Sequence, residues 1–388
     1  MIETNKIPVG WTDANLVDNL EALIDYRGKT PEKSDNGILT LSAKSVKMGY
    51  IDYSQAYYIS KETYDRFMVR GFPKVGDVLM TTEAPLGCIA RLDRDDVAIA
   101  QRLLTLRGKE NILDNDYLRY YLTSRKGQHE LSSRASGSTV EGIKRSEFVN
   151  VKILLPTDIN EQKAISKVIR VFDDKIELLQ AQNKTLEAIA QTIFAEWFNK
   201  YKNGDELLEG WQIDRLETIA NHSKTSIKPF DNPDDEYYHF SLPSYDNGLM
   251  PVIEKGDMIK SNKYLVENNS FLVSKLNPFT PRIWTIFDAQ QNFICSTEFQ
   301  VVKPKEELYF SLIHCFLNSN EFTSELSQKI KGTSSSHQRV NPKDIFDVEL
   351  VIPSESDLTK FNSAIYPLLA KKNINHKQIQ TLSQTRDE

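Results

Sequence analysis

The chain repeats itself, and this repeat constrains its fold more than any other feature of the sequence. The segment Trp11–Leu16 has the same tryptophan-to-leucine spacing as Trp211–Leu216. Near the end of each half, the apolar run Val151–Pro156 has its counterpart in Val348–Pro353. Because the matching segments keep their order and nearly the same separation, the two halves are expected to form units of the same kind.

Each half ends in a segment whose apolar residues alternate by three and four positions, the spacing of a coiled-coil seam. Such spacing over several heptads predicts a long helix that packs along another helix. Phe361 stands 196 residues after Ile165, a whole number of heptads, so the two seams are in phase. The predicted seam residues are Ile165, Ile169, Phe172, Ile176, Leu179, Leu186 and Ile193 in the first half, and Phe361, Ile365, Leu368, Ile379 and Leu382 in the second.

Polar residues interrupt both seams. Asn183 interrupts the first, whereas Lys372 and Asn375 interrupt the second and are expected to weaken it. One helix of this kind is typical of a dimerisation segment. Two of them in one chain, separated by a domain, can instead pair in antiparallel fashion within the monomer and bury both seams.

The repeat therefore predicts an α+β fold, in which two mixed α/β domains are joined by two long antiparallel coiled-coil helices with a pseudo-twofold internal repeat. Strand-like stretches such as 76–80 and 269–273 are bounded by turn residues. The predicted parts are a first domain at residues 1–156, a first helix at 157–203, a second domain at 204–354 and a second helix at 355–388.

The composition is that of a folded protein. Hydrophobic residues make up 40% of the chain and charged residues 26%, which argues against a disordered chain. The first residues lack the apolar segment of a signal peptide, and no stretch approaches the roughly 18 apolar residues that cross a membrane. We therefore expect a cytoplasmic protein with no membrane contact.

The sequence contains no complete catalytic motif. Gly28–Thr30 resembles the end of a phosphate-binding loop, but Leu23 stands where that loop needs a glycine. Asn277–Phe279 lacks the second proline of an adenine-methyltransferase loop, and Pro233–Asp234 lacks the downstream carboxylates of a nuclease metal site. The three cysteines and six histidines lack metal-ligand spacing. We expect no metal, no cofactor and no catalytic residue, which favours a binding role.

Polar loops with interleaved basic and aromatic residues occur twice in each half. Arg and Gln can read base edges, whereas Ser, Thr and Lys suit phosphates, although a solvated turn is the commoner role for any single residue. Because the formal net charge is −6, basic residues must gather locally or a partner must supply phosphate contacts. The candidate DNA-binding residues are Arg27, Lys29, Lys44, Lys47, Tyr57, Ser138, Thr139, Lys144 and Arg145 in the first half, and Lys224, Lys228, Ser335, His337, Gln338 and Arg339 in the second.

Over essentially its whole length, the sequence resembles the specificity subunit of type I restriction-modification systems. The segments that carry the resemblance are Pro8–Trp11, Gly76–Leu79, Pro85–Gly87, Leu155–Ile176 and Phe194–Phe198. The second half departs from this pattern, because Pro353–Asp357 stands where the first half has Glu161 and Gln162. The start of the second helix is therefore expected to be degenerate.

The resemblance implies a non-catalytic subunit whose two target recognition domains each read one half of a bipartite sequence in double-stranded DNA. The helices would act as the spacer and would dock two modification subunits, which restriction subunits join for cleavage. Adenine-N6 methylation and ATP-dependent cleavage would then belong to the partners. Two other hypotheses remain open: a coiled-coil scaffold that binds no DNA, and the specificity portion of a split nuclease-methyltransferase.

Overall fold

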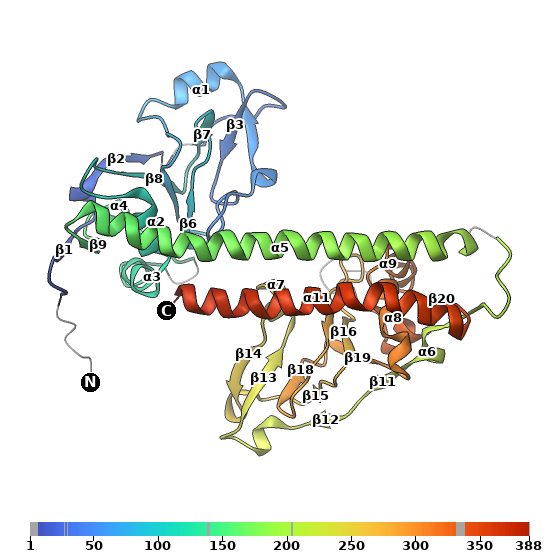
Figure 1. The fold of residues 1–388 in the computed structure, drawn as a ribbon. Coiled ribbons are helices and arrows are strands. Elements are labelled where there is room, and N and C mark those ends of the chain that lie inside the picture. Colours follow the sequence, from blue (N-terminus) through green and yellow to red (C-terminus); the bar gives the residue numbers. More distant parts are fainter. Residues whose placement is uncertain are drawn as a thin grey trace. The chain divides into compact units, whose positions relative to one another are not determined.

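The computed structural model describes residues 7–26, 28, 30–137, 140–202, 205–330 and 338–387 (Figure 1). Contacts between residues divide the chain into two units. The first contains Met1–Lys175 and Ser383–Glu388, and the second contains Ile176–Leu382. The two long helices, α5 (Ile159–Lys202) and α11 (Glu355–Asp387), contribute residues to both units.

The first unit is built around a four-stranded antiparallel sheet of order β2-β8-β5-β6. Its strands are β2 (Leu20–Asp25), β8 (Leu103–Gly108), β5 (Val78–Thr82) and β6 (Leu86–Arg91). A three-stranded sheet of order β4-β3-β7 lies in the same unit, and its strands β3 and β7 are parallel. They are β4 (Tyr57–Ile59), β3 (Ile38–Leu41) and β7 (Val97–Ile99).

Strand β5 separates two cores, which explains why all five of its residues are buried. Val78 and Met80 pack in one core with apolar residues of α2 (Asn115–Thr123) and α3 (Arg125–Ser132). Leu79 packs in the other core, with residues of the three-stranded sheet. Successive side chains of a strand point to opposite faces, so this apolar run serves both cores.

The remaining elements of the first unit are short. Strand β1 (Trp11–Asn15) pairs in antiparallel fashion with β9 (Lys152–Pro156), immediately before α5. Two helices complete the unit: α1 (Lys61–Phe67) and α4 (Arg145–Phe148).

The second unit repeats this plan. Its four-stranded sheet has the order β11-β19-β16-β17, and its strands are β11 (Ala220–Ser223), β19 (Phe299–Pro304), β16 (Ser270–Ser274) and β17 (Ile283–Ile286). The smaller sheet has gained strands and has the order β12-β15-β18-β13-β14. Those strands are β12 (Ser226–Ile227), β15 (Lys263–Leu265), β18 (Phe293–Cys295), β13 (Glu236–Phe240) and β14 (Val252–Lys255).

The equivalences extend to details of pairing. Strands β13 and β18 are parallel, as β3 and β7 are. Strand β10 (Gln212–Arg215) pairs with β20 (Glu349–Ile352) before α11, as β1 pairs with β9 before α5. The helices of this unit are α6 (Leu216–Ile219), α7 (Leu242–Asp246), α8 (Phe310–Leu317), α9 (Asn320–Gln328) and α10 (Pro342–Phe346). The predicted α+β class and internal repeat are confirmed.

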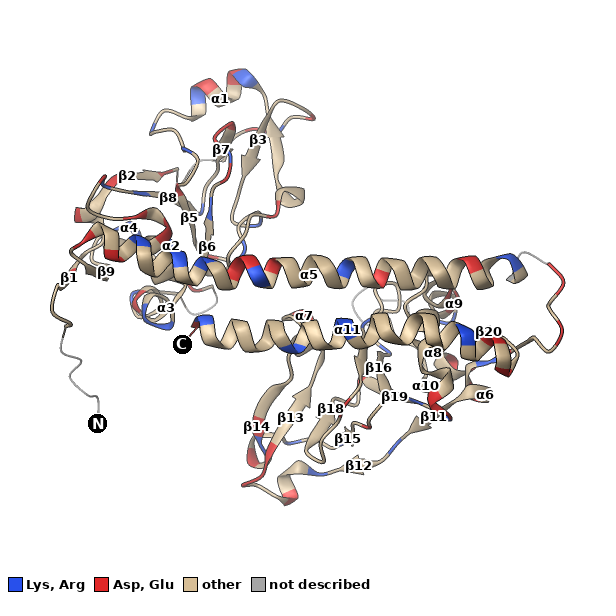
Figure 2. Ribbon diagram, viewed as in Figure 1, with Lys and Arg blue, Asp and Glu red and all other residues tan. Residues whose placement is uncertain are grey.

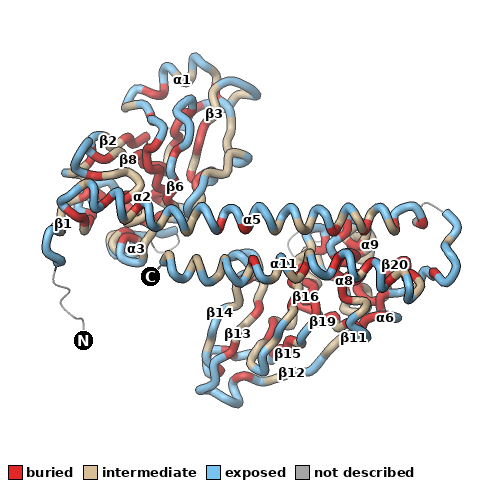
Figure 3. The backbone as a smooth tube through the Cα atoms, viewed as in Figure 1, coloured by how far each residue is buried: buried red, intermediate tan, exposed pale blue. Residues whose placement is uncertain are grey.

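Within the second unit, α5 and α11 pack side by side and run antiparallel (Figure 1). Phe361 near the start of α11 packs against Phe198 near the end of α5, and Asn375 in the middle of α11 contacts Asn183 in the middle of α5. Figure 3 shows short buried and half-buried stretches recurring between exposed ones along both helices, the pattern of a helix with one packed face. The antiparallel coiled-coil prediction is confirmed.

In the first turn of each long helix, a carboxylate accepts a hydrogen bond from a tryptophan indole. The Trp11 indole donates to Glu161 Oε1 at 3.0 Å, and the Trp211 indole donates to Asp357 Oδ2 at 3.0 Å. Asp357 stands 196 residues after Glu161, the same displacement as the seams. The expectation of a degenerate second helix start is therefore wrong in this respect, because a shorter carboxylate at the equivalent position accepts the same bond.

In the described part of the chain, no helix combines the length and apolar character needed to cross a membrane.

Candidate DNA interface

In the first half, an ion pair links two residues that flank the polar loops predicted to bind DNA. One loop contains Arg27 and Lys29, and the other contains Ser138 and Thr139. Arg145 is the first residue of α4 and follows the second loop, and Asp25 ends β2 just before the first loop. Arg145 Nη1 donates to Asp25 Oδ2 at 3.1 Å. The Arg145 side chain is 56% exposed whereas that of Asp25 is 7% exposed, so a buried carboxylate holds an exposed guanidinium.

A second arginine, Arg70, reaches the same place and was missed from the sequence. Its Nη1 donates to the backbone oxygen of Asp25 at 2.9 Å, and its backbone N–H donates to the Tyr26 hydroxyl at 2.8 Å. The Tyr26 hydroxyl in turn donates to the Gly71 carbonyl. Burial raises the pKa of Tyr26. In the sequence, the tyrosine directly after the strand-like stretch 20–25 is the one signal that could have pointed to the anchor of Arg70.

These groups line a shallow depression of about 600 Å³ on the first unit. Its lining residues are Asp25, Arg70, Lys144 and Arg145. Lys144 is exposed and is the N-cap of α4. Three cationic side chains around one carboxylate give the depression a net positive character, which suits an anionic or acceptor-rich ligand such as a nucleic acid.

Other predicted residues of the first half lie elsewhere in the fold. Lys44 is exposed and Lys47 half-buried, both in the segment between β3 and β4. Tyr57 begins β4, and Lys33 Nζ lies 4.9 Å from the centroid of its ring. Burial raises the pKa of Tyr57. These residues belong to the three-stranded sheet and its loop, whereas Asp25 belongs to the four-stranded sheet.

In the second half, the structure anchors Gln338 and Arg339 beside the loop that follows β16. The Gln338 carbonyl accepts from the Asn277 backbone N–H, and Arg339 forms an isolated antiparallel bridge with Leu276. Arg339 Nη2 donates to Glu298 Oε1 at 3.1 Å. The first half has the equivalent backbone arrangement, because Gly142 bridges to Glu83 after β5.

The other basic residues predicted in the second half flank strand β12. Lys224 and Lys228 are both exposed. His222, two residues before Lys224, is half-buried and stacks on Phe346 with ring centroids 5.1 Å apart. Burial lowers the pKa of His222, which favours a neutral, structural imidazole over a cation for DNA.

The rest of the predicted DNA-binding residues lie outside the described residues. They are Arg27, Lys29, Ser138, Thr139, Ser335 and His337. Among the residues that the structure does describe, no cluster of His, Cys, Asp and Glu could hold a metal ion. Figure 2 shows acidic and basic residues interspersed along both units.

A family model for the type I restriction modification DNA specificity domain matches residues 8–188 and, a second time, residues 208–384. The chain belongs to this family. The double match coincides with the two halves of the repeat, and specificity subunits of type I systems are their non-catalytic subunits.

Individual specificity subunits are similar to this one over differing lengths. The specificity subunit of the type I restriction enzyme MjaIX from Methanocaldococcus jannaschii is 27% identical over 368 residues, which cover 85% of this chain and 79% of that subunit. The HindI specificity subunit from Haemophilus influenzae is 25% identical over 143 residues, 35% of this chain and 31% of its own.

A solved structure shares the fold. The S subunit of a type I restriction-modification system from M. genitalium aligns over 100% of this chain and 96% of its own, with a TM-score of 0.58 and 15% identity. At that identity, the likeness is one of fold alone.

The specificity subunit holds its two long helices together with a polar layer that the sequence did not predict. Asn375 is fully buried, and its amide donates to Gln182 Oε1 at 2.7 Å and to Asn183 Oδ1 at 2.9 Å. The polar interruptions of the two seams therefore meet each other. A buried amide pair of this kind fixes the register of two helices.

A half-buried carboxylate one turn further along α5 joins this layer to the second domain. Glu187 accepts from Lys372 Nζ on α11 at 2.5 Å and lies 3.1 Å from His314 Nε2 on α8. Burial raises the pKa of Glu187, but the hydrogen bonds and charges of His314 and Lys372 more than offset this and hold it well below its usual range. The expected weak points of the seam are thus bonded.

The predicted seam residues differ in burial. Phe361, Ile365, Ile176 and Leu179 are buried. The half-buried members are Ile165, Ile169, Phe172, Leu186, Ile193, Leu368, Ile379 and Leu382. Ile165 and Ile193 each pack against the core of the domain beside them, so these two positions serve a domain core as well as the helix.

Proposed function

We propose that this chain is the DNA-reading subunit of a type I restriction-modification complex, with each recognition domain reading one half of a bipartite duplex target. The observation that carries the proposal is an exposed arginine held by a carboxylate in each half. Each half presents an exposed arginine, Arg145 or Arg339, in the polar region before its last strand. In this proposal, residues 1–156 and 204–354 form the recognition domains.

The long helices, residues 157–203 and 355–388, are proposed to act as spacer and dock. Apolar side chains stand exposed on them, although soluble proteins bury such side chains when they can. Val168, Val171, Leu178 and Ile189 of α5 and Ile374 of α11 are between 43% and 62% exposed. Two modification subunits are proposed to cover these faces, and restriction subunits then join the assembly. The complex would work in the cytoplasm.

In this proposal, the partners carry the chemistry. Adenine-N6 methylation belongs to the modification subunits, and ATP-dependent cleavage belongs to the restriction subunits. The net charge of −6 also fits a subunit whose partners supply much of the phosphate contact.

Reconstitution tests the proposal. The purified chain, supplied with the methyl donor and duplex DNA, should transfer no methyl group. With its modification subunits, it should direct adenine methylation to one split sequence, and a scrambled duplex should remain unmodified. Binding should weaken as salt is raised, because phosphate contacts release counterions. Methylation by the isolated chain would contradict the proposal, and so would an assembled complex that binds both duplexes equally.

A further inference from the structure

The two halves share an arrangement that the family match does not assign to any residue. In each half, an arginine that is more than half exposed pairs at 3.1 Å with one oxygen of a carboxylate. The carboxylates are far less exposed, at 7% for Asp25 and 27% for Glu298. A buried or half-buried acid beside an exposed guanidinium differs from an ordinary surface ion pair, in which both partners face water.

The carboxylates are held on ordered backbone. Asp25 pairs with Leu104 in the ladder between β2 and β8. The Glu298 carbonyl accepts from the Lys275 backbone N–H at 3.0 Å, and its own N–H donates to Ser296 Oγ. An arginine side chain has several rotatable bonds, so a fixed partner reduces the entropy that it loses when it binds a ligand.

The geometry leaves most of each guanidinium available. One terminal nitrogen of each arginine, Arg145 Nη1 and Arg339 Nη2, donates to the carboxylate. A guanidinium carries five N–H donors, and a guanine edge in the major groove needs two of them, for O6 and N7. Each arginine can therefore keep its carboxylate and still bind a guanine.

The paired charge also selects the kind of ligand. The carboxylate offsets the charge of its own guanidinium, so a phosphate contact through this arginine gains less from counterion release than one through a cation without such a partner. An uncharged base edge with two acceptors depends less on that charge. The pairs therefore favour base reading over backbone contact.

We propose that Arg145 and Arg339 each read a guanine in their own half-site, and that Asp25 and Glu298 are positioning residues that orient these two arginines. This inference rests on the proposed function. The repeat does not copy the pairs, because Arg145 lies inside α4 whereas Arg339 precedes α10. The guanine that each arginine reads should therefore stand at a different place in its half-site.

The test uses the full chain assembled with its modification subunits and a duplex library of random sequence, with methylated adenines mapped by sequencing. The variants are D25N and R145K for the first half, and E298Q and R339K for the second. R145K keeps the positive charge but loses the paired N–H donors of the planar guanidinium. The matched control is D96N, which removes the carboxylate of another arginine pair in the first unit, Arg94 with Asp96.

We expect D25N and R145K to relax one guanine position of one half-site, by roughly 5- to 150-fold in discrimination. The other half-site should be unchanged. E298Q and R339K should do the same to the opposite half-site. The double variant D25N/R145K should be no worse than R145K, because Asp25 acts through Arg145, and D25E should restore part of the preference. D96N should leave both half-sites intact.

Three outcomes would overturn the inference while the wild-type complex still methylates one split sequence. They are an unchanged preference in D25N and R145K, a uniform loss of methylation with the same consensus, and a change in both half-sites at once. Thermal unfolding and complex assembly of each variant separate a folding defect from these results. A wild-type complex without sequence preference would instead contradict the proposed function itself.

Discussion

The two domains share a strand order but differ in how they use the long helices. In the second unit, one continuous core takes in α5 residues such as Phe194 and Phe198 together with Phe361 and Ile365 of α11. In the first unit, the corresponding core takes only the half-buried Ile165 from a long helix. The second domain is therefore anchored by apolar burial on both helices.

The first unit uses polar contacts in the equivalent place. Asp173 of α5 accepts from the Tyr120 hydroxyl at 2.8 Å, from Arg119 at 3.2 Å and from Arg386 near the end of α11 at 3.0 Å. Phe194 and Phe198 of α5 belong to the core of the second unit, whereas Arg386 of α11 forms an ion pair with Asp173 in the first.

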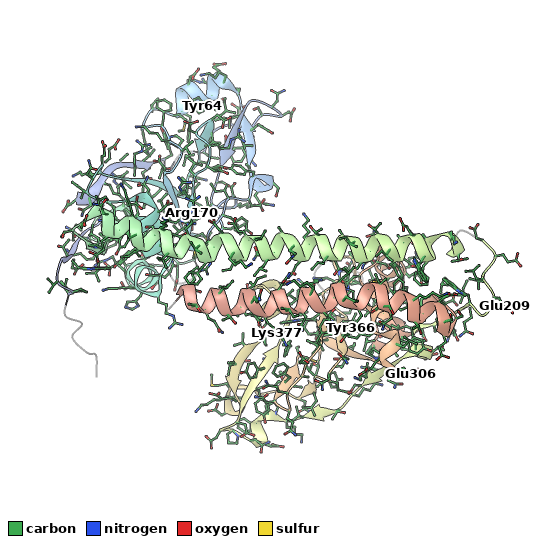
Figure 4. The ribbon with its side chains drawn as sticks, in the orientation of Figure 1. Tyr64, Arg170, Glu209, Glu306, Tyr366 and Lys377 are labelled. Carbon is green, nitrogen blue, oxygen red and sulfur yellow. The ribbon has the colours of Figure 1, made fainter. Side chains whose placement is uncertain are left out.

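The second domain also contacts the middle of α11. Tyr366 and Lys377 project from that helix (Figure 4). Tyr366 lies near Phe310, with ring centroids 6.1 Å apart, and Lys377 pairs with Asp288 at 2.7 Å. A duplicated fold can therefore keep its strand order while one copy contacts the long helices through apolar side chains and the other through polar ones.

Removing an aromatic anchor gives the largest expected effect. Phe361 is fully buried and packs against Trp197 and Phe198. Phe361→Ala should lower the free energy of unfolding by about 4 kcal/mol, and Ile165→Ala, at the equivalent half-buried position, by about 2 kcal/mol. Urea unfolding of the two variants measures both losses. Equal losses would remove the contrast between the anchors.

Neutralising the half-buried Glu187 of the second unit should lower the free energy of unfolding almost as much. Glu187→Gln leaves Lys372 and His314 without their carboxylate, which should cost about 3 kcal/mol at neutral pH. Because the folded pKa of Glu187 is lowered, its contribution is complete above the ordinary glutamate pKa of about 4.3 and is lost as the pH falls below it. The stability difference between wild type and variant should therefore shrink below about pH 4. A difference that grows with acid would contradict this account.

The polar layer between the helices should give a smaller effect. Asn375→Ala leaves the amide groups of Gln182 and Asn183 without their partner, which should cost about 1–2 kcal/mol. Replacing Asn183 and Asn375 together by leucine should recover most of this loss, because the two facing amides are removed together and the exposed Gln182 can bond to water. If the double variant unfolds more easily than Asn375→Ala, the polar layer stabilises the helix pair by more than the hydrogen bonds within it.

The smallest effect is expected at the start of α11. The pKa of Asp357 is lowered to about 2 by hydrogen bonds from Trp211, Lys360 and Ser354. NMR titration of the side-chain carboxyl should give a midpoint near 2, and Trp211→Phe should raise it because the largest of these bonds is lost. A depressed folded pKa means that the contribution is present above the ordinary aspartate pKa and fades as the pH falls toward 2. An unperturbed midpoint would show that the bond does not persist in solution.

The sequence predicted the repeat, the α+β class and the antiparallel helices, because periodic apolar spacing and repeated segments are local signals. It could not predict that Asn183 would meet Asn375, since that pairing depends on the register of two helices distant in sequence. The predicted weak seam became a bonded polar layer for the same reason. Apolar spacing along one helix reveals a polar interruption, but it does not show which residue of the other helix bonds to it.

The candidate site was predictable to a similar degree. The interleaved polar and basic residues pointed to the regions that contain Arg145 and Arg339. The structure describes both of these arginines. It did not reveal Asp25, Arg70 or Glu298, because their contacts join segments brought together only by the fold. Arg145 and Asp25 are 120 positions apart in the chain, and no local pattern reports such a contact. The base-reading roles of all these residues remain predictions.

The most direct test of the account is an exchange of one recognition domain. Residues 12–150 are replaced by the same segment of another specificity subunit, and methylated adenines are mapped genome-wide in a host carrying the complete system. The account predicts that one half of the bipartite target changes while the other half and the spacer length remain. Loss or change of both halves together would contradict the claim that each domain reads its own half-site.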